Sequence, residues 1–253
     1  MLVLSDVLGN ELSAIGSGPF VADPSTFDEA LAVARRANGV PAVVLRALEA
    51  GARGERDETP KPGDACFARF RHHLLASNAS LIDAAADAAT ELGYRRITRV
   101  EPSGDDVEAV AGRLGELART MGPNELVVSG GEPTVRLPPA PERGGRNQHL
   151  ALLVAQRLHE LAVVAADRSR AVTVEPRAHF LALASDGDDG NTDAAGAAVS
   201  SSSWDAMLAA RLDPLGALAR ADAHAPLLAA RAIVRTGPTG TNVLDLHLLE
   251  TVP

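Results

Sequence analysis

The sequence is poor in lysine, cysteine and aromatic residues, and each shortage narrows what the protein can do. Of its 253 residues, Lys61 is the only lysine and Cys66 the only cysteine, while Phe, Trp and Tyr together make up 3%. A lone cysteine forms no internal disulfide, which fits a reducing compartment, and we expect Cys66 to be a small buried side chain. Any lysine that binds phosphate must be Lys61, or must lie outside this chain.

Long apolar runs and a basic charge balance are also missing. No apolar run approaches the roughly 20 residues needed to cross a bilayer, and the first six residues carry no basic leader, so we expect a cytoplasmic protein without a membrane partner. The net charge of −9 argues against nucleic acid as a partner. The sequence has no G-x-x-x-x-G-K-[ST] stretch and no complete G-x-G-x-x-G, which disfavours a P-loop enzyme and a Rossmann dehydrogenase.

What is present is a regular alternation of apolar strand-like runs and helical segments. This alternation predicts a layered, largely parallel α/β fold, with 46% hydrophobic residues available for its cores. We expect a boundary near Met121, which divides the chain into domains 1–121 and 122–253. The first run, 1–7, reads as a buried strand at the very start of the chain, and this indicates an incomplete first domain. The expected strands are 1–7, 73–76, 96–100, 125–128, 180–184 and 243–249, and the expected helices are 28–38, 41–50, 79–92, 105–120 and 147–166.

The most informative segment is Thr236-Gly237-Pro238-Thr239-Gly240-Thr241-Asn242, which is rich in backbone N–H groups and hydroxyls and carries no charge. Its two glycines permit the positive φ angles that turn successive amides inward around an anion. The segment could equally be a glycine-rich turn before a strand. Three further polar, glycine-rich loops occur at 129–134, 144–148 and 185–190. Four such loops in one chain favour a site for a phosphorylated ligand and its metal.

Two of these loops supply candidate charged ligands. Asp186 and Asp189 follow an apolar strand and can offer carboxylate oxygens to Mg²⁺, although the alternative is a solvated acidic turn. An EF-hand is excluded because the twelfth position counted from Asp186 is Ala197. Arg146 follows two glycines at the expected start of a helix, where a guanidinium and a helix N-terminus can converge on one anion.

Two more carboxylates stand at expected strand ends. Asp6 is a candidate to orient a hydroxyl substrate or to accept its proton, and otherwise caps the turn that contains Gly9. Glu132 could bind a metal through water or orient a ribose hydroxyl, or it could cap a turn. The histidines at 72, 73, 149 and 224 show no metal-ligand spacing, and we expect them to be structural or exposed.

Taken in order, seven motifs along the whole chain resemble those of the glycerate 2-kinase family: 5–10, 16–19, 59–64, 130–134, 144–148, 186–193 and 236–242. The last four resemble that family's C-terminal MOFRL module. The resemblance implies an incomplete Rossmann-like domain at 1–121 followed by a MOFRL domain at 122–253. It also implies phosphorylation of the 2-hydroxyl of D-glycerate by ATP with Mg²⁺, and it allows a homodimer.

By match to those motifs, the resemblance assigns residue roles. Asp6 and Arg146 would be catalytic, and Asp186 and Asp189 would bind the metal. The residues that would bind the nucleotide are Gly130, Gly131, Glu132, Thr134, Thr236, Gly237, Thr239, Gly240, Thr241 and Asn242.

The chain departs from the family pattern in three respects. Asn10 and His149 stand where aspartate and glutamate are expected, and an N-terminal portion that includes a functional lysine has no counterpart. Lys61 does not match that lysine's motif. Two rival functions stay open, a hydroxypyruvate reductase and a non-catalytic fragment that binds nucleotide.

Overall fold

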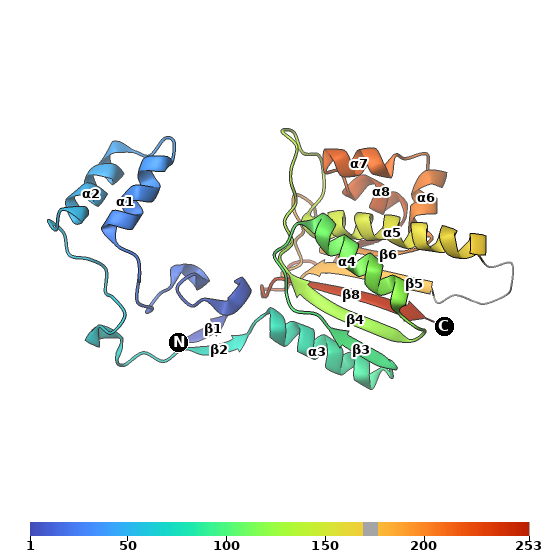
Figure 1. The fold of residues 1–253 in the computed structure, drawn as a ribbon, viewed down its shortest axis with the longest axis horizontal. Helices are drawn as coiled ribbons and strands as arrows, with labels where there is room; N and C mark the ends of the chain where they lie inside the picture. The colour runs from blue at the N-terminus through green and yellow to red at the C-terminus, as the bar shows by residue number, and fades with distance from the viewer. Residues whose placement is uncertain (169–176, 253) are drawn as a thin grey trace. The chain divides into compact units, whose positions relative to one another are not determined.

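The structure is a computed structural model that describes residues 1–168 and 177–252 (Figure 1). The chain forms two compact units, and each is described by itself. One consists of Met1–Leu2 and Gly9–His73, and the other of Val3–Leu8 and Leu74–Pro253.

The first unit is built on two helices, α1 (Phe27–Arg36) and α2 (Ala42–Ala52), which pack against each other. Thr26 begins α1 with a capping box: its hydroxyl accepts from the Glu29 N–H at 3.2 Å, and the Glu29 carboxylate accepts from the Thr26 N–H at 2.8 Å. A Cβ on Gly51 would lie 2.2 Å from the Phe27 ring, so glycine permits the close approach of the two helices.

The two rare residues of this unit differ in their surroundings. Lys61 donates to the Thr59 hydroxyl at 2.8 Å and pairs with Glu58 at 3.2 Å, so its ammonium is engaged within the unit. Cys66 is exposed, and the expectation of a buried side chain is therefore wrong. It lies in a short 3₁₀ turn, Ala65–Phe67, that contributes no buried residue.

A small sheet pairs β1 (Leu2–Leu4) with β2 (His73–Ala76). Both strands were expected, but the prediction that the first is buried is wrong. Of its three residues only Val3 is buried, while Leu2 and Leu4 are 69% and 45% exposed.

The second unit is organised around one six-stranded sheet. Its strands are ordered β3 (Arg96–Arg99), β4 (Glu125–Gly131), β8 (Asp245–Val252), β5 (Arg177–Ala184), β6 (Gly196–Ser200) and β7 (Ile233–Val234). The expected α/β class is confirmed, but the sheet is mixed rather than largely parallel. Among the described strand pairs of this sheet, only β3 and β4 are parallel. Strand β8 lies between β4 and β5 and is antiparallel to both, and β6 pairs antiparallel with β5 without a crossover helix between them.

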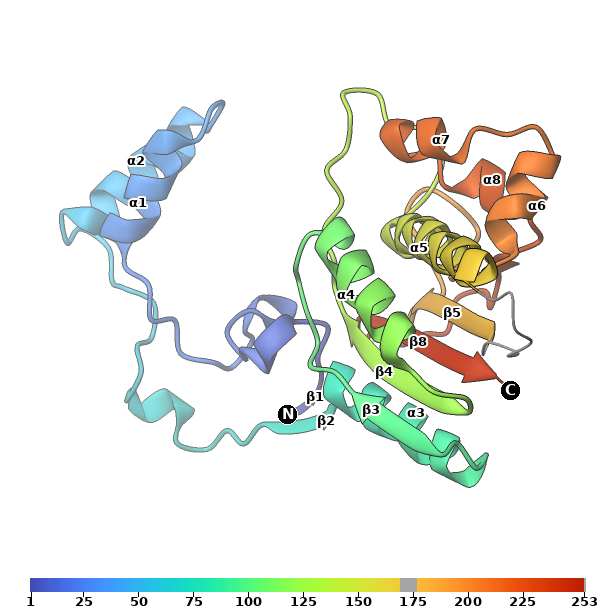
Figure 2. The same ribbon diagram turned by 45° about the vertical axis from the view of Figure 1, so that its right-hand side comes forward.

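Helices cover the two faces of this sheet unequally (Figures 1 and 2). On one face lie α4 (Val107–Thr120) and α5 (Arg146–Arg168), and three short helices pack on α5 beyond them: α6 (Ser203–Ala209), α7 (Pro214–Arg220) and α8 (His224–Ala229). On the other face α3 (Asn78–Glu91) packs on β3 and β4. Every residue of β4 is buried because helices cover both its sides.

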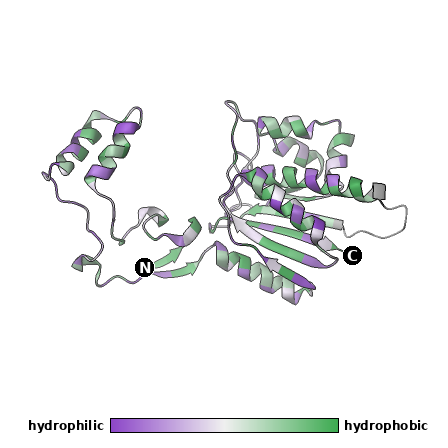
Figure 3. Cartoon of the chain, in the orientation of Figure 1, coloured by the Kyte–Doolittle hydropathy of each residue, from purple (hydrophilic) through white to green (hydrophobic). Residues whose placement is uncertain are grey.

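The main core lies between the sheet and α5. It joins Leu150, Leu152 and Val154 of α5 to Phe180 of β5 and Leu249 of β8. A smaller core lies under α3. Figure 3 shows hydrophobic and hydrophilic residues interspersed along α3 and α4, as expected for helices with one buried face.

The two compact units divide near residue 73, whereas the domain boundary was expected near 121. Residues 96–120 supply β3 and α4 to the same sheet and core as β4 and α5. A family boundary at 121 stays a prediction. Among the described residues no helix is long and apolar enough to cross a membrane.

Candidate functional site

Three polar segments meet at one end of the central strands of the six-stranded sheet: the loop after β4, the loop after β5 and the segment before β8. Gly131 at the end of β4 and Ala184 at the end of β5 both stand opposite Asp245, the first residue of β8. Because β4 and β5 both run antiparallel to β8, the segments that follow them and the segment that precedes β8 converge there. They border a cavity of about 860 Å³, whose polar lining includes Glu132, Arg146, His149, Asp186, Asp188, Asp189, Asn191 and Asn242.

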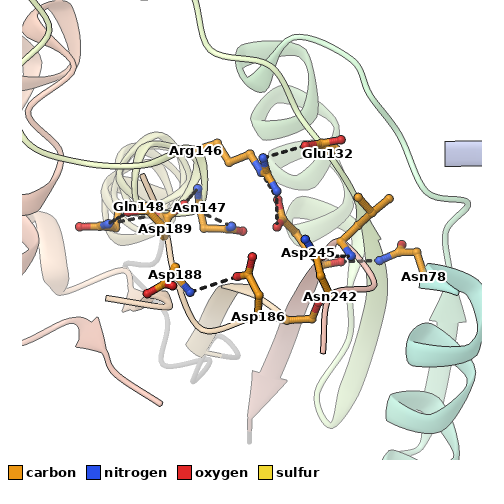
Figure 4. A network of polar contacts seen from close by, with 12 residues as sticks. Asn78, Glu132, Arg146, Asn147, Gln148, Asp186, Asp188, Asp189, Asn242 and Asp245 are labelled. Atoms are coloured by element: carbon orange, nitrogen blue, oxygen red, sulfur yellow. Dashed lines mark hydrogen bonds and ion pairs between the residues drawn. The ribbon is translucent and has the colours of Figure 1, made fainter. Parts of the chain in front are cut away.

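Arg146 forms two ion pairs in this cavity (Figure 4). Its Nε and Nη2 atoms donate to the two carboxylate oxygens of Asp245 at 2.6 and 3.0 Å, and Nη1 donates to Glu132 at 2.9 Å. The Asp245 side chain is 1% exposed and that of Glu132 is 47% exposed. Burial raises the pKa of Asp245, and Arg146 opposes that shift. Although burial lowers the pKa of Arg146, the hydrogen bonds and charge of Asp245 outweigh it and keep that pKa raised.

The turn before β8 holds Asp245 in place. Leu244 adopts a φ of 66°, which is strained for a bulky side chain, and its N–H donates to the Asn242 side chain at 2.9 Å. The buried amide of Asn78, at the start of α3, donates to the carbonyls of Val243 and Asp245, both at 2.8 Å. Hydrogen bonds made by the side chains of Asn242 and Asn78 therefore both hold this strained turn.

The N-terminus of α5 is capped by a residue far along the chain. Asp189 is buried, and its carboxylate accepts the backbone N–H groups of Asn147 at 2.9 Å and Gln148 at 2.8 Å, together with the Gln148 side-chain amide at 2.9 Å. A Cβ on Gly145 would lie 2.3 Å from the Asp189 carboxyl carbon, so this contact requires glycine. The arrangement satisfies helix N–H groups that otherwise lack partners.

The two aspartates that were expected to bind a metal thus differ in their surroundings. Asp186 lines the cavity and accepts the Asp188 N–H at 3.0 Å, whereas the oxygens of Asp189 are engaged by α5. Within the described residues no three His, Cys, Asp or Glu side chains form a preassembled metal cluster. The Oδ1 atom of Asn147 is buried beside this region without a hydrogen-bond partner among the described residues.

The segment 236–242 has the backbone that its glycines suggested. Gly237 and Gly240 have φ angles of 68° and 75°. The Thr239 hydroxyl donates to the Ser185 carbonyl at 2.6 Å and its N–H to the Asp186 carbonyl at 2.9 Å, so the segment is fastened to the loop after β5. Only Asn242 of this segment lines the cavity, and anion binding by the rest stays a prediction.

The two glycines at the end of β4 have close neighbours. A Cβ on Gly130 would lie 2.4 Å from the Asn78 side chain and 2.5 Å from the Asp245 carbonyl. On Gly131, with a φ of 118°, it would lie 2.2 Å from the Ser103 carbonyl. Packing requires glycine at both positions. Glu132 and Thr134 line the cavity, and nucleotide binding by these four residues stays a prediction.

The remaining predicted site residues are less closely associated with the cavity. Asp6 is exposed and is not part of the lining, although Leu8 is. His149 is buried in the lining, and burial lowers its pKa. His224 contacts the Gln148 side chain at 2.7 Å, in agreement with a structural role.

Sequence reasoning missed Asp245 and His247. The signal for both was that Asp245 and His247 alternate with leucines at the start of the run that forms β8. His247 is fully buried, neither ring nitrogen has a partner among the described residues, and burial lowers its pKa to about 3.

The sequence matches two protein families and is similar to several known proteins. Residues 125–245 match the MOFRL family, and residues 1–49 match a domain of unknown function, DUF4147. A glycerate 2-kinase of Pyrococcus horikoshii is 31% identical over 96% of this chain and 53% of its own length. A glycerate kinase of Macaca fascicularis is 30% identical over 100% of this chain and 72% of its own.

The crystal structure of a glycerate kinase from Thermotoga maritima superimposes with a TM-score of 0.79 at 31% identity, covering 99% of this chain and 56% of that one. Some relatives are instead named putative hydroxypyruvate reductase. The chain spans about half the length of several relatives.

Proposed function

Because this chain belongs to the glycerate kinase family, we propose that it transfers a phosphoryl group from ATP, with Mg²⁺, to the 2-hydroxyl of D-glycerate. The products are 2-phospho-D-glycerate and ADP. The observation that carries the proposal is the convergence of Arg146, Glu132 and Asp186 on one cavity at the sheet edge. Transfer of this kind depends mainly on positioning and charge neutralisation.

The charges of the cavity favour an anion that arrives with a divalent cation. The positive charge of Arg146 is paired with the carboxylates of Glu132 and Asp245. The cavity lining also contains the carboxylates of Asp186 and Asp188. An anion alone would be repelled by this excess of negative charge, whereas a bound Mg²⁺ would reduce the repulsion between the carboxylates and the nucleotide phosphates.

The oxygen donors present fit Mg²⁺. This ion commonly uses one or two carboxylates together with substrate phosphates, so it needs no preassembled cluster. Asp186 is the first candidate ligand, and the unpartnered Oδ1 of Asn147 is a hard oxygen in the same region. Asp189 is the second proposed carboxylate, and it would have to give up hydrogen bonds from α5 to bind the metal directly. When bound, Mg²⁺ neutralises charge on the transferred group.

The chain's own residues would bind the anionic groups, orient the hydroxyl substrate and contact the nucleotide. Arg146 has five N–H groups, of which three donate to Asp245 and Glu132, so one on each Nη atom is left for an anionic oxygen. Asp6 would orient the attacking hydroxyl or accept its proton. Thr134 and Asn242 would contact the nucleotide, together with the glycine-rich segments.

The experiment measures ADP formation by the 253-residue chain with Mg-ATP and D-glycerate, with the Thermotoga maritima enzyme as positive control. We expect Arg146→Ala to lower kcat/KM by about 100-fold or more. Arg113→Ala is the matched control, because Arg113 also pairs with a carboxylate, Asp105 at 2.8 Å, and does not line the cavity. Full activity in both Arg146→Ala and Asp6→Asn would refute the assigned roles.

The reductase name of some relatives defines the rival function. NADH oxidation with hydroxypyruvate, in the absence of ATP, would favour it, although the sequence lacks the dinucleotide fingerprint. Calorimetric binding of Mg-ADP without turnover would favour the non-catalytic fragment.

A further inference from the structure

We propose that Asp245 is a positioning residue whose buried carboxylate fixes the guanidinium of Arg146, so that the two remaining N–H groups of Arg146 serve the ligand in the cavity. The inference rests on the proposed function in one respect, that this ligand is an anionic substrate. Asp245 itself touches no reacting atom and acts only through Arg146.

The hydrogen bonds distinguish Asp245 from the other carboxylate on Arg146. Asp245 uses both oxygens and occupies the Nε–Nη2 edge of the guanidinium, which fixes the plane of the group. Glu132 makes one contact, to Nη1, from a half-exposed side chain. A single contact in water restrains orientation weakly. Glu132 can therefore yield its place to a ligand oxygen, whereas Asp245 stays bound.

Several independent contacts fix the backbone around Asp245. The residue is flanked by Gly131 on β4 and Ala184 on β5, so both neighbouring strands fix its position. Leu244 before it is held at a φ of 66°, and Asn78 bonds the carbonyls on both sides of Leu244. Strain that persists under such restraint is typical of pre-organised sites. The orientation of Arg146 is thus set by the sheet edge and α3 rather than by α5 alone.

A double-mutant cycle tests whether Asp245 acts through Arg146. Asp245→Asn keeps the shape of the side chain and removes one acceptor oxygen and the charge. We expect it to lower kcat/KM for D-glycerate by about 100-fold, as misplacement of a binding group by about 1 Å does. The double variant Arg146→Ala/Asp245→Asn should then be no more than about 3-fold worse than the poorer single variant. Multiplicative losses would show an independent role and would overturn the proposal.

Asp105→Asn is the matched control, because Asp105 pairs with Arg113 at 2.8 Å and does not line the cavity. We expect its kcat/KM to stay within about 5-fold of the wild type, since an exposed ion pair contributes little. A loss equal to that of Asp245→Asn would contradict a role specific to the carboxylate that holds Arg146.

A second measurement needs neither turnover nor a folded Asp245 variant. In ¹⁵N-labelled wild-type protein, the Arg146 Nε–H, assigned by its loss in Arg146→Lys, should exchange with solvent at least about 10-fold more slowly than that of Arg113. Equally fast exchange overturns the proposal even if Asp245→Asn fails to fold. Slow exchange without conversion of D-glycerate by any variant would refute the proposed function and leave the positioning pair standing.

Discussion

Removing the Asp189 carboxylate should destabilise the second unit well beyond the loss of an ordinary helix cap. In Asp189→Ala, two backbone N–H groups and the Gln148 amide lose an acceptor at 2.8–2.9 Å in a buried environment. At about 1 kcal/mol for each lost hydrogen bond, the free energy of unfolding should fall by about 3 kcal/mol. For a unit of this size that corresponds to a fall in Tm of roughly 6–12 °C.

Asp213→Ala is the matched control, because Asp213 is an exposed aspartate that caps α7 through one contact, the Gly216 N–H at 3.0 Å. Its loss should cost about 1 kcal/mol. Asp189→Asn, which keeps one acceptor oxygen, should fall between the two.

The assay is urea unfolding followed by fluorescence of Trp204, the only tryptophan of the chain, which is buried in the core of the second unit. If Asp189→Ala costs no more than Asp213→Ala, the capping role assigned to Asp189 is wrong. Asp189 would then be free to act chiefly as a metal ligand, as the sequence suggested.

Three further predictions concern other buried or crowded groups. His247 has a folded pKa of about 3 against 6.5 for an unfolded histidine, so its contribution to stability is full above pH 6.5 and is lost as pH falls toward 3. His247→Leu should reduce the pH dependence of the unfolding free energy in that range by up to about 1.4 kcal/mol per pH unit, and an unchanged slope would contradict the burial. Burial and the hydrogen bond to Glu250 raise the pKa of Tyr94, the only tyrosine, to about 12. Absorbance at high pH should therefore show ionisation near 12 in the folded protein and near 10 after unfolding, with stability lost as pH rises between those values, and native ionisation near 10 would refute this account. Gly187→Ala should lower the free energy of unfolding by more than about 2 kcal/mol, because its Cβ would lie 2.1 Å from the Gly237 carbonyl. Gly93→Ala is the control and should cost about 1 kcal/mol, because Gly93 also has a positive φ but has open space around it. Equal costs would show that the loops containing Gly187 and Gly237 are not packed against each other as described.

The sequence predicted the long elements best, for a physical reason. The apolar periodicity of 147–166 and the apolar run of 125–128 reflect burial that both α5 and β4 have in the structure. The short elements β6, β7, α6, α7 and α8 were missed because pieces of two to seven residues contain too little periodicity. Strand direction was wrong because β8, although last in the chain, inserts between β4 and β5.

The sequence predicted some of the residues that line the cavity, but it did not predict the contacts that these residues make. Arg146, Glu132 and Asp186 were identified from their motifs, and all three line the cavity. The pairing of Arg146 with Asp245 and the capping of α5 by Asp189 join segments far apart in the chain, so local sequence holds no trace of them. Cys66 was expected to be buried because cysteine usually is, but it lies in an exposed turn.

The most direct test of the central claim is ³¹P NMR of the product formed by the 253-residue chain from Mg-ATP and D-glycerate. The account predicts 2-phospho-D-glycerate, whose phosphorus couples to a single methine proton, and its loss in Arg146→Ala but not in Arg113→Ala. Phosphorus coupled to two methylene protons would mean transfer to the 3-hydroxyl, and product formation that survives Arg146→Ala unchanged would contradict the role of the cavity.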